Sequence, residues 1–278
     1  MASKRKTYKR TGPTAKELLA KVEVGAVQFM STDKWHEWLD SATKFHDYSF
    51  YNCMMILSQS PTATRVAGYQ TWKRLGRQVN KGETGIRILA PVKFTKQVER
   101  KTGETETVSG LAFRTVCVFD IAQTDGDDLP GLVEDMKGES QQEMLTMLIR
   151  VATDLGLNVV AKFTGAKGGW ITRNGEIALS DTTSPNQQAK TLLHEIGHKL
   201  LGHFEREALD SHIREIEAES LAYIVASRMG FDTESYSFGY VANWGQNKEG
   251  VQQLMRESGP AIIQAEKVLV DLIEQATI

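Results

Sequence analysis

The stretch Leu192-Leu193-His194-Glu195-Ile196-Gly197-His198 is the most informative part of this 278-residue chain. On an α-helix, residues i and i+4 project from the same face, so His194 and His198 can hold one tetrahedral Zn²⁺ together. Glu195 stands beside the first imidazole, and its carboxylate can reach a water molecule at an open coordination position. The stretch therefore predicts a helical metal site with a general base next to it.

Flanking residues place this motif inside a helix of about 17 residues. Ser184 suits the N-cap, Pro185 the first helical position and Gln187 a capping box. Gly202 suits the position just after the last turn. The other face of the helix carries apolar residues that predict packing against a core: Ala189, Leu192, Leu193, Ile196, Leu200 and Leu201. The alternative, two histidines without a metal, is disfavoured by the combination of helix, spacing and glutamate.

The two histidines need a third protein ligand, because a catalytic zinc site keeps its fourth position for water. Residues 211–229 have the pattern of a helix that is apolar nearly all round and therefore buried. On this helix Glu215 and Glu219 share one stripe, whereas Glu217 points to the opposite side, near Arg228. Because buried carboxylates are costly unless they are paired or coordinate an ion, this stripe is the expected source of the ligand.

We predict Glu215 as the third ligand and Glu219, one turn later, as the carboxylate that orients a ligating imidazole. The reverse assignment stays open, since spacing does not fix which carboxylate reaches the metal. His203 fits poorly as a ligand because it follows His198 by five residues, past the expected helix end. An oxyanion would need one more hydrogen-bond donor, for which three residues are candidates: Tyr240, His212 and Tyr223.

The metal motif and the segment Glu215-Ile216-Glu217-Ala218-Glu219-Ser220-Leu221-Ala222 resemble gluzincin-type peptidases of the ImmA/IrrE group and, more closely, the C-terminal domain of ArdC-type antirestriction proteins. The resemblance implies a zincin fold, in which a small antiparallel sheet lies against the active-site helix. It also implies a zinc metalloendopeptidase with Glu195 as the catalytic acid and base, although such sites accept other divalent metals. Between the glutamate and the second histidine of the metal motif, this chain has Ile196-Gly197, which is closer to the ImmA form of the motif than to the ArdC form. The subfamily therefore stays open.

Strands are predicted from the sequence on both sides of the chain's middle. Near the metal motif there are three short ones, with a hairpin turn at 173–176 between the last two: 157–163, 170–172 and 177–179. Residues 73–88 predict a helix, a glycine turn and a strand, and 96–107 predict a hairpin tip.

Basic and acidic residues are unevenly distributed. Residues 1–120 carry 20 Lys+Arg and 11 Asp+Glu, a net charge of +9, so the remaining residues carry 13 and 24, a net charge of −11. Such asymmetry indicates a polyanion as the partner of the basic half. Residues 1–12 are predicted to be a flexible basic arm, with a solvated tail as the alternative.

Aromatic and basic residues interleave in the segment from Trp35 to Arg87. This segment contains eight of the chain's 22 aromatic residues. Rings can stack on exposed bases while Lys and Arg follow the phosphates, the combination that binds single-stranded nucleic acid. Trp35, Trp38 and Phe45 have helical spacing and are assigned to the core. The predicted DNA-binding residues are others of this segment: Tyr48, Asn52, Arg65, Tyr69, Trp72, Lys73, Arg77, Lys81 and Arg87.

Four segments closely resemble the N-terminal single-stranded-DNA-binding domain of ArdC-like proteins: 46–52, 61–72, 76–91 and 118–124. Since both halves match in order, the resemblance implies an antirestriction-like metallopeptidase of a mobile element that binds single-stranded DNA and acts on or protects incoming DNA. One alternative is a non-catalytic protein that coats single strands and carries a structural metal. Another is an ImmA-like peptidase that cleaves a repressor.

The chain as a whole is predicted to be an α+β protein of two domains. They are an ArdC-like DNA-binding domain at 1–123 and a zincin-like metallopeptidase domain at 141–278, joined by a linker at 124–140. Without a long apolar stretch or a signal-peptide pattern, we expect a soluble cytoplasmic protein with no membrane partner, whose partners are single-stranded DNA and an unidentified protein substrate. Cys53 and Cys117 are predicted to be reduced core thiols.

Overall fold

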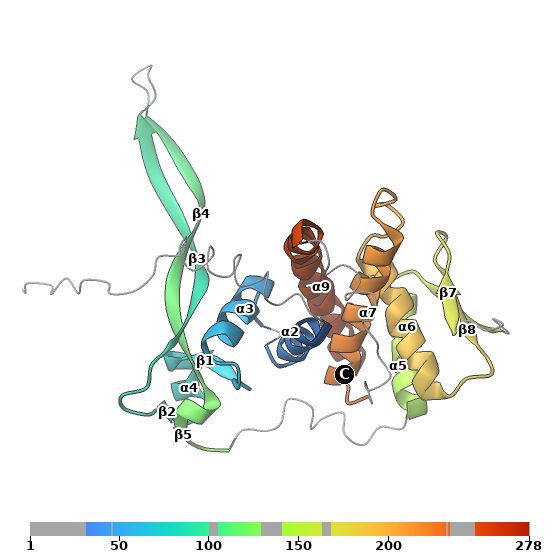
Figure 1. Cartoon of the computed structure of the whole chain (residues 1–278), viewed down its shortest axis with the longest axis horizontal. Helices are drawn as coiled ribbons and strands as arrows, with labels where there is room; N and C mark the ends of the chain where they lie inside the picture. The colour runs from blue at the N-terminus through green and yellow to red at the C-terminus, as the bar shows by residue number, and fades with distance from the viewer. Residues whose placement is uncertain are drawn as a thin grey trace, which may run out of the picture.

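Helices occupy the middle of the molecule and lie between two groups of short and long strands (Figure 1). The computed structural model describes residues 32–45, 47–99, 105–128, 141–162, 168–231, 233 and 248–277. These residues form α-helices and three small sheets, which confirms the predicted α+β class.

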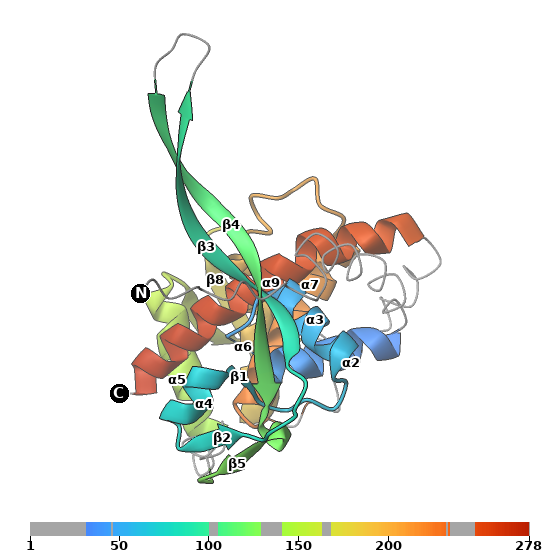
Figure 2. The same cartoon turned by 90° about the vertical axis from the view of Figure 1, so that its left-hand side faces the viewer.

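The N-terminal sheet is dominated by one long hairpin. Its strands lie in the order β1-β4-β3 and are β1 (Val66–Gly68), β3 (Ile86–Glu99) and β4 (Thr105–Asp120). β3 and β4 pair antiparallel without interruption, from Ile86 opposite Val118 to Glu99 opposite Thr105. They extend beyond the helices as a two-stranded arm (Figures 1 and 2). The hairpin predicted at 96–107 is therefore confirmed, although its tip lies outside the described residues.

A second, two-stranded sheet lies beside the first. β2 (Arg77–Val79) pairs antiparallel with β5 (Thr124–Gly126), next to the short helix η2 (Ile121–Gln123). Gly126 has a φ of 136° and its Cα faces the carbonyl of Gly76, where a Cβ would collide. β5 occupies the start of the segment that the sequence assigned to a linker.

Two helices, α3 (Phe50–Gln59) and α4 (Tyr69–Arg74), pack against these strands, and α2 (Thr32–Lys44) packs against α3. Trp35, Trp38 and Phe45 are almost completely buried, which confirms their assignment to the core. Ser49 caps α3 by accepting a hydrogen bond from the backbone N–H of Asn52.

Side chains of α3 cover the outer edge of β3. The Asn52 amide exchanges two hydrogen bonds of 2.9 Å with the backbone of Leu89, and the Gln59 amide exchanges bonds of 2.8 and 2.9 Å with the backbone of Arg87. These amides take the place of a neighbouring strand, so the exposed backbone groups of an edge strand are satisfied at these two residues.

The C-terminal sheet has the strand order β6-β8-β7, with β6 (Asn158–Lys162), β7 (Gly169–Ile171) and β8 (Glu176–Ser180). β7 and β8 form the predicted antiparallel hairpin, and Gly175 has the positive φ of 81° that its turn requires. β6, however, pairs parallel with β8. The sheet is mixed because β7 occupies the outer edge, so that β8 returns between β7 and β6 in the direction of β6.

Four longer helices cover this sheet and the space between the two halves: α5 (Gln141–Asp154), α6 (Pro185–Leu200), α7 (Ser211–Arg228) and α9 (Lys248–Thr277). The predicted ends of α6 are confirmed. Ser184 accepts a hydrogen bond from the backbone N–H of Gln187 at 3.3 Å, and Gly202 has a φ of 65° after the last turn. Within the described residues, no helix combines the length and apolarity needed to cross a membrane.

One hydrophobic core includes residues of α2 and α3 together with residues of α5, α6, α7 and α9. Polar contacts join α2 to α7: Trp35 Nε1 donates to Ser220 Oγ at 3.0 Å, and the Tyr223 hydroxyl donates to Asp40 at 2.6 Å. Because helices of both predicted domains share this core, the division at residues 123 and 141 stays a prediction.

The two cysteines have different environments. Cys53 is fully buried in α3, and burial raises the pKa of its thiol to about 12. Cys117 is exposed on β4, opposite Arg87. The prediction of a core thiol is confirmed for Cys53 and wrong for Cys117, because alternate residues of a strand face opposite sides and Cys117 is on the open side.

Glu266 of α9 is a fully buried carboxylate. Its Oε1 accepts a hydrogen bond from Arg228 at 3.1 Å, while Oε2 has no hydrogen-bond partner among the described residues. Burial raises the pKa of Glu266 from the ordinary 4.5 to about 7. Between these two values the folded protein binds more protons than the unfolded chain, so stability falls as the pH rises through this window.

We therefore expect Glu266→Gln to unfold at the same denaturant concentration as the wild type at pH 5. At pH 8 the variant should be more stable by about 2 kcal/mol, because the wild type must then ionise a buried group or keep it protonated at a cost. Urea unfolding at the two pH values measures the difference. Lower stability of the variant at pH 8 would mean that the ion pair with Arg228 outweighs the cost of burial.

Candidate functional site

Imidazoles of α6 and a carboxylate of α7 converge on one point. The Nε2 atoms of His194 and His198 lie 3.0 Å apart. The Glu215 carboxylate oxygens lie 3.3 Å from His194 Nε2 and 3.6 Å from His198 Nε2. Ligand atoms about 2.0–2.1 Å from one tetrahedral ion lie about 3.3 Å from one another, so the spacing of these three side chains fits a divalent metal.

Glu219 orients the first imidazole. Its Oε2 lies 2.9 Å from His194 Nδ1, so that Nδ1–H donates to the carboxylate and Nε2 faces the cluster. Burial alone would lower the pKa of His194, but hydrogen bonds to Glu215 and Glu219 outweigh burial and raise it to about 10. Burial and the charge of His194 lower the pKa of His198 to about 4. An ion that binds both Nε2 atoms must therefore displace one proton.

His203, which the sequence disfavoured as a ligand, contacts the His198 imidazole at Nδ1, the ring nitrogen that does not face the cluster. The Nδ1 atoms of His203 and His198 lie 2.8 Å apart, and His203 Nε2 lies 2.9 Å from Glu217 Oε2. When His198 Nδ1–H donates to His203 and His203 Nε2–H donates to Glu217, His198 Nε2 is left for a metal. The turn at Gly202 returns the chain to α6 and makes this contact.

Glu217 is the centre of a buried polar network. Its carboxylate accepts hydrogen bonds from Arg206 at 2.8 and 3.3 Å and from Ser258 Oγ at 2.5 Å. Burial would raise the pKa of Glu217, but the hydrogen bonds outweigh burial and hold the pKa below its ordinary value. The expected proximity to Arg228 is wrong, because Arg228 pairs with Glu266.

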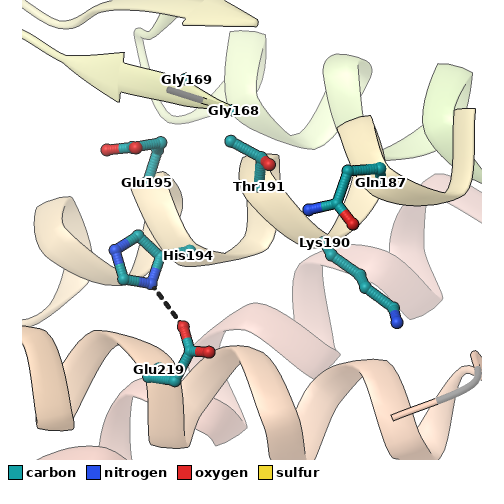
Figure 3. Close-up of a pocket in the computed structure, with 8 residues that line it drawn as sticks. All are labelled: Gly168, Gly169, Gln187, Lys190, Thr191, His194, Glu195 and Glu219. Carbon is teal, nitrogen blue, oxygen red and sulfur yellow. Dashed lines mark hydrogen bonds and ion pairs between the residues drawn. The ribbon is translucent and has the colours of Figure 1, made fainter. Parts of the chain in front are cut away.

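Glu195 lines a cleft of about 350 Å³ beside His194. Figure 3 shows the Glu195 side chain toward β7 and the His194 side chain toward Glu219 of α7. The rest of the cleft wall consists of Gly168, Gly169, Gln187, Lys190 and Thr191. A Cβ on Gly169 would lie 2.6 Å from atoms of both Ala178 and Thr191, so glycine allows β7 to approach α6. The sequence did not indicate Lys190 or Thr191, because they become cleft residues only through the approach of β7.

The three candidates for an oxyanion donor have different positions. Tyr223 is buried at the α2 contact, where its hydroxyl donates to Asp40, and burial raises its pKa to about 12. His212 is exposed in the first turn of α7, and Tyr240 lies outside the described residues. Tyr223 is therefore excluded as a donor at the cleft in this conformation.

Two residues predicted to bind DNA belong to the core. Trp72 is fully buried, and its indole N–H donates to the carbonyl of Phe119 at 2.9 Å. Asn52 is buried at the edge of β3, where both ends of its amide are bonded to Leu89. Neither side chain has a face on which a base can stack, so we remove both from the predicted DNA surface.

Arg77 holds β5 against β2. Its guanidinium donates to Thr124 Oγ1 at 2.8 Å, to the carbonyls of Thr124 and Gly126 at 3.1 Å each, and to the carbonyl of Asp127. Because these bonds use most of its donors, Arg77 is also removed from the predicted phosphate contacts.

The other predicted DNA-binding residues lie at the surface. Tyr69 is 43% exposed, and its hydroxyl accepts a hydrogen bond from Gln78 at 2.8 Å. The half-buried Tyr48 donates its hydroxyl to the carbonyl of Val66 at 3.0 Å. The basic residues of the set are half-buried or exposed: Arg65, Lys73, Lys81 and Arg87.

Comparison with known proteins identifies both halves. A family model of the N-terminal domain of the anti-restriction factor ArdC matches residues 8–119, and a model of the IrrE N-terminal-like domain matches residues 152–229. An uncharacterized protein from Bacillus anthracis is 25% identical over 291 residues, which cover 89% of this chain and 49% of that protein. The chain thus spans about half the length of the curated relative that it matches.

Two crystal structures of the antirestriction protein ArdC from the R388 plasmid have a similar fold. The metal-free structure has a TM-score of 0.61 at 19% identity and covers 93% of this chain and 98% of that one. The Mn(II)-bound structure has a TM-score of 0.53 at 18% identity and covers 92% and 98%. The chain thus carries, in this order, a segment that matches the ArdC N-terminal domain and a segment that matches the IrrE-like domain, in a fold similar to that of ArdC.

Proposed function

We propose that this chain is a single-stranded-DNA-binding metallopeptidase of the antirestriction kind, which acts on or protects DNA that enters a cell. The observation that carries the proposal is the convergence of His194, His198 and Glu215 beside a cleft that contains Glu195. The match to the ArdC N-terminal domain supports DNA binding by the first half. Two imidazoles and one carboxylate suit zinc, and they also accept other divalent ions such as manganese.

The chemistry follows from the positions of the side chains. A divalent ion held by His194, His198 and Glu215 would supply Lewis-acid activation of a water molecule and of the scissile carbonyl. Glu195, only 7% exposed, accepts the proton of that water and then donates it to the leaving amine. In the described part of the C-terminal sheet β7 pairs only with β8, so its outer edge is available to an extended peptide.

DNA binding would determine where the peptidase acts. A site fixed on a single strand meets proteins bound to the same strand at a high effective concentration, without any additional contact between enzyme and substrate. The basic first half and the acidic second half are consistent with this division of roles, because only the first half attracts phosphates.

Metal and oligonucleotide binding by the full chain test the proposal. After dialysis against zinc or manganese, we expect one ion per chain in the wild type and none in the His194→Ala/His198→Ala variant, with equal affinity of both for labelled oligothymidine. The His36→Ala/His212→Ala variant is the matched control and should retain the ion. Affinity for the oligonucleotide should fall steeply between about 50 and 200 mM salt, because each phosphate contact contributes about −0.7 to the salt slope.

Two results would contradict parts of this proposal. A wild type that binds no divalent ion would remove the peptidase chemistry. A full chain that binds no oligonucleotide, or binds it without dependence on salt, would instead favour a peptidase whose first half recognises a protein such as a repressor.

A further inference from the structure

The arm formed by β3 and β4 is uncovered over much of its length. α3 covers the outer edge of β3 only as far as Leu89. From there the side chains at 91–95 and 111–114 are exposed, apart from the half-buried Val92. Figure 2 shows both strands leaving the body of the molecule. Since a two-stranded ribbon encloses no core of its own, its side chains contact either water or a ligand.

The most exposed large apolar side chains of the described residues lie on this arm. Leu111 is 64% exposed and Phe113 is 59% exposed. Phe94, 42% exposed, lies over Gly110, with ring atoms 3.0 Å from the position that a Cβ would occupy. Burying an apolar side chain of this size is favourable by up to about 1.5–3 kcal/mol, so a ligand that covers Leu111 and Phe113 would gain affinity from both.

The strand register places these side chains beside positive charges. Leu111 lies opposite Lys93, and Phe113 lies opposite Pro91. Because side chains alternate between the two faces of a strand, Leu111, Phe113 and Lys93 share one face, and Arg87, six residues before Lys93, shares it too. All charged residues in 86–94 and 110–118 are positive: Arg87, Lys93 and Arg114.

We propose that this face of the arm, defined by Arg87, Lys93, Leu111 and Phe113, is a binding strip for single-stranded nucleic acid. A base stacks on the ring of Phe113, Leu111 covers the neighbouring sugar or base, and Lys93 and Arg87 contact phosphates. This inference rests on the single-strand binding proposed above, and it adds the position of the bound strand on the protein. The strip is continuous with the predicted DNA surface, since Arg87 belongs to both.

Charge favours a nucleic acid over other occupants of the strip. Two copies of this chain that met through the strip would bring Lys93 and Arg87 of one copy close to the same cations of the other, and like charges across an interface are unfavourable. A phosphate backbone complements these cations, and stacking on Phe113 tolerates any base sequence. In the register, Phe113 lies between Arg87 and the Lys93–Leu111 pair, so one extended strand can contact cations and apolar side chains at once.

Anisotropy of a labelled oligothymidine, titrated with the full chain at several salt concentrations, tests the strip. Phe113→Ala should bind about 5- to 150-fold more weakly than the wild type at an unchanged salt slope, because it removes stacking and no charge. Phe113→Tyr should restore most of the affinity. Lys93→Ala should reduce the salt slope by about 0.7. Val268→Ala and Lys44→Ala change exposed residues elsewhere and should bind like the wild type.

The reactivity of Cys117 gives an independent test of where the oligonucleotide binds. Cys117 is exposed opposite Arg87 on the same face as the strip, whereas Cys53 is buried. Bound oligonucleotide should therefore slow the reaction of Cys117 with a maleimide, as measured by mass spectrometry of the full chain. An equal rate with and without saturating oligonucleotide would contradict the position of the strip at Arg87.

The outcomes separate this inference from the proposed function. If Phe113→Ala and Lys93→Ala bind oligothymidine as well as the wild type and with the same salt slope, the strip is not the binding site, while the proposed DNA binding is still supported. If the wild type does not bind, the proposed DNA binding fails, and the strip fails with it. If Phe113→Ala keeps its oligonucleotide affinity but loses self-association in sedimentation, or loses binding to phosphatidylserine vesicles, the strip serves a second copy or a membrane and the inference is overturned.

Discussion

Replacing Glu195 by glutamine is expected to slow peptide hydrolysis about a thousandfold while metal content stays at the wild-type level. The carboxylate is 7% exposed and lines the cleft beside His194, where it is placed to take a proton from water. Glutamine has nearly the same size but cannot accept that proton. Hydrolysis of fluorescein-labelled casein by the metal-loaded chain, with metal analysis of the same samples, measures both quantities.

The same variant distinguishes two ways in which the chain could protect DNA. If proteolysis protects incoming DNA, Glu195→Gln should lose protection of an unmodified plasmid in a restricting host while it binds oligonucleotides normally. If coating of the strand is sufficient, Glu195→Gln should protect fully, and Tyr69→Ala should not. Gln187→Ala, a change in the same cleft wall, is the matched control. Wild-type hydrolysis by Glu195→Gln would exclude Glu195 as the base.

Signals that act within one or two helical turns were sufficient to predict α6 and its motif. Ser184 and Gly202 mark the two ends of the helix. Ser184 does so through a local hydrogen bond and Gly202 through its own backbone angle, so no knowledge of the fold was needed. The i, i+4 spacing likewise places His194 and His198 on one face whatever surrounds the helix. The ArdC-like resemblance then supplied the order of the two halves.

Contacts between distant segments could not be predicted in the same way. His203 reaches His198 only because the chain turns at Gly202, and Glu217 meets Ser258, which lies 41 residues later on another helix. Sequence distance to the motif therefore indicated only that His203 is a poor ligand. The sequence contained no information on a role of His203 as the hydrogen-bond partner of the ligating imidazole.

Aromatic and basic composition was also insufficient to separate surface from core in the first half. Tyr69 and Trp72 lie in the same short helix α4, yet Tyr69 is exposed and Trp72 is buried against β4. Exposed apolar residues of the arm, such as Phe113, resemble core residues of a strand in the sequence. Only the register and the length of the arm show that nothing in the described chain covers them.

Glu217→Leu is expected to lower the free energy of unfolding by about 3–5 kcal/mol, because it removes one partner from a buried ionic network. Leucine leaves Arg206, Ser258 and His203 without the carboxylate that now accepts from them. The lowered pKa of Glu217 means that the wild type has this stability above pH 4.5 and loses it as the pH falls further. Urea unfolding at pH 7 and at pH 4 should therefore show a large difference that shrinks in acid.

The matched control is Glu207→Ala, which removes a carboxylate from the exposed ion pair with Arg173 and should cost no more than about 1 kcal/mol. Metal affinity gives a second reading. His203→Ala keeps Glu217 but no longer orients His198, so it should weaken zinc binding about 10- to 100-fold with a smaller loss of stability. If Glu217→Leu unfolds like the wild type, or if His203→Ala binds zinc with unchanged affinity, the hydrogen-bonded chain from Glu217 through His203 does not support the metal ligand.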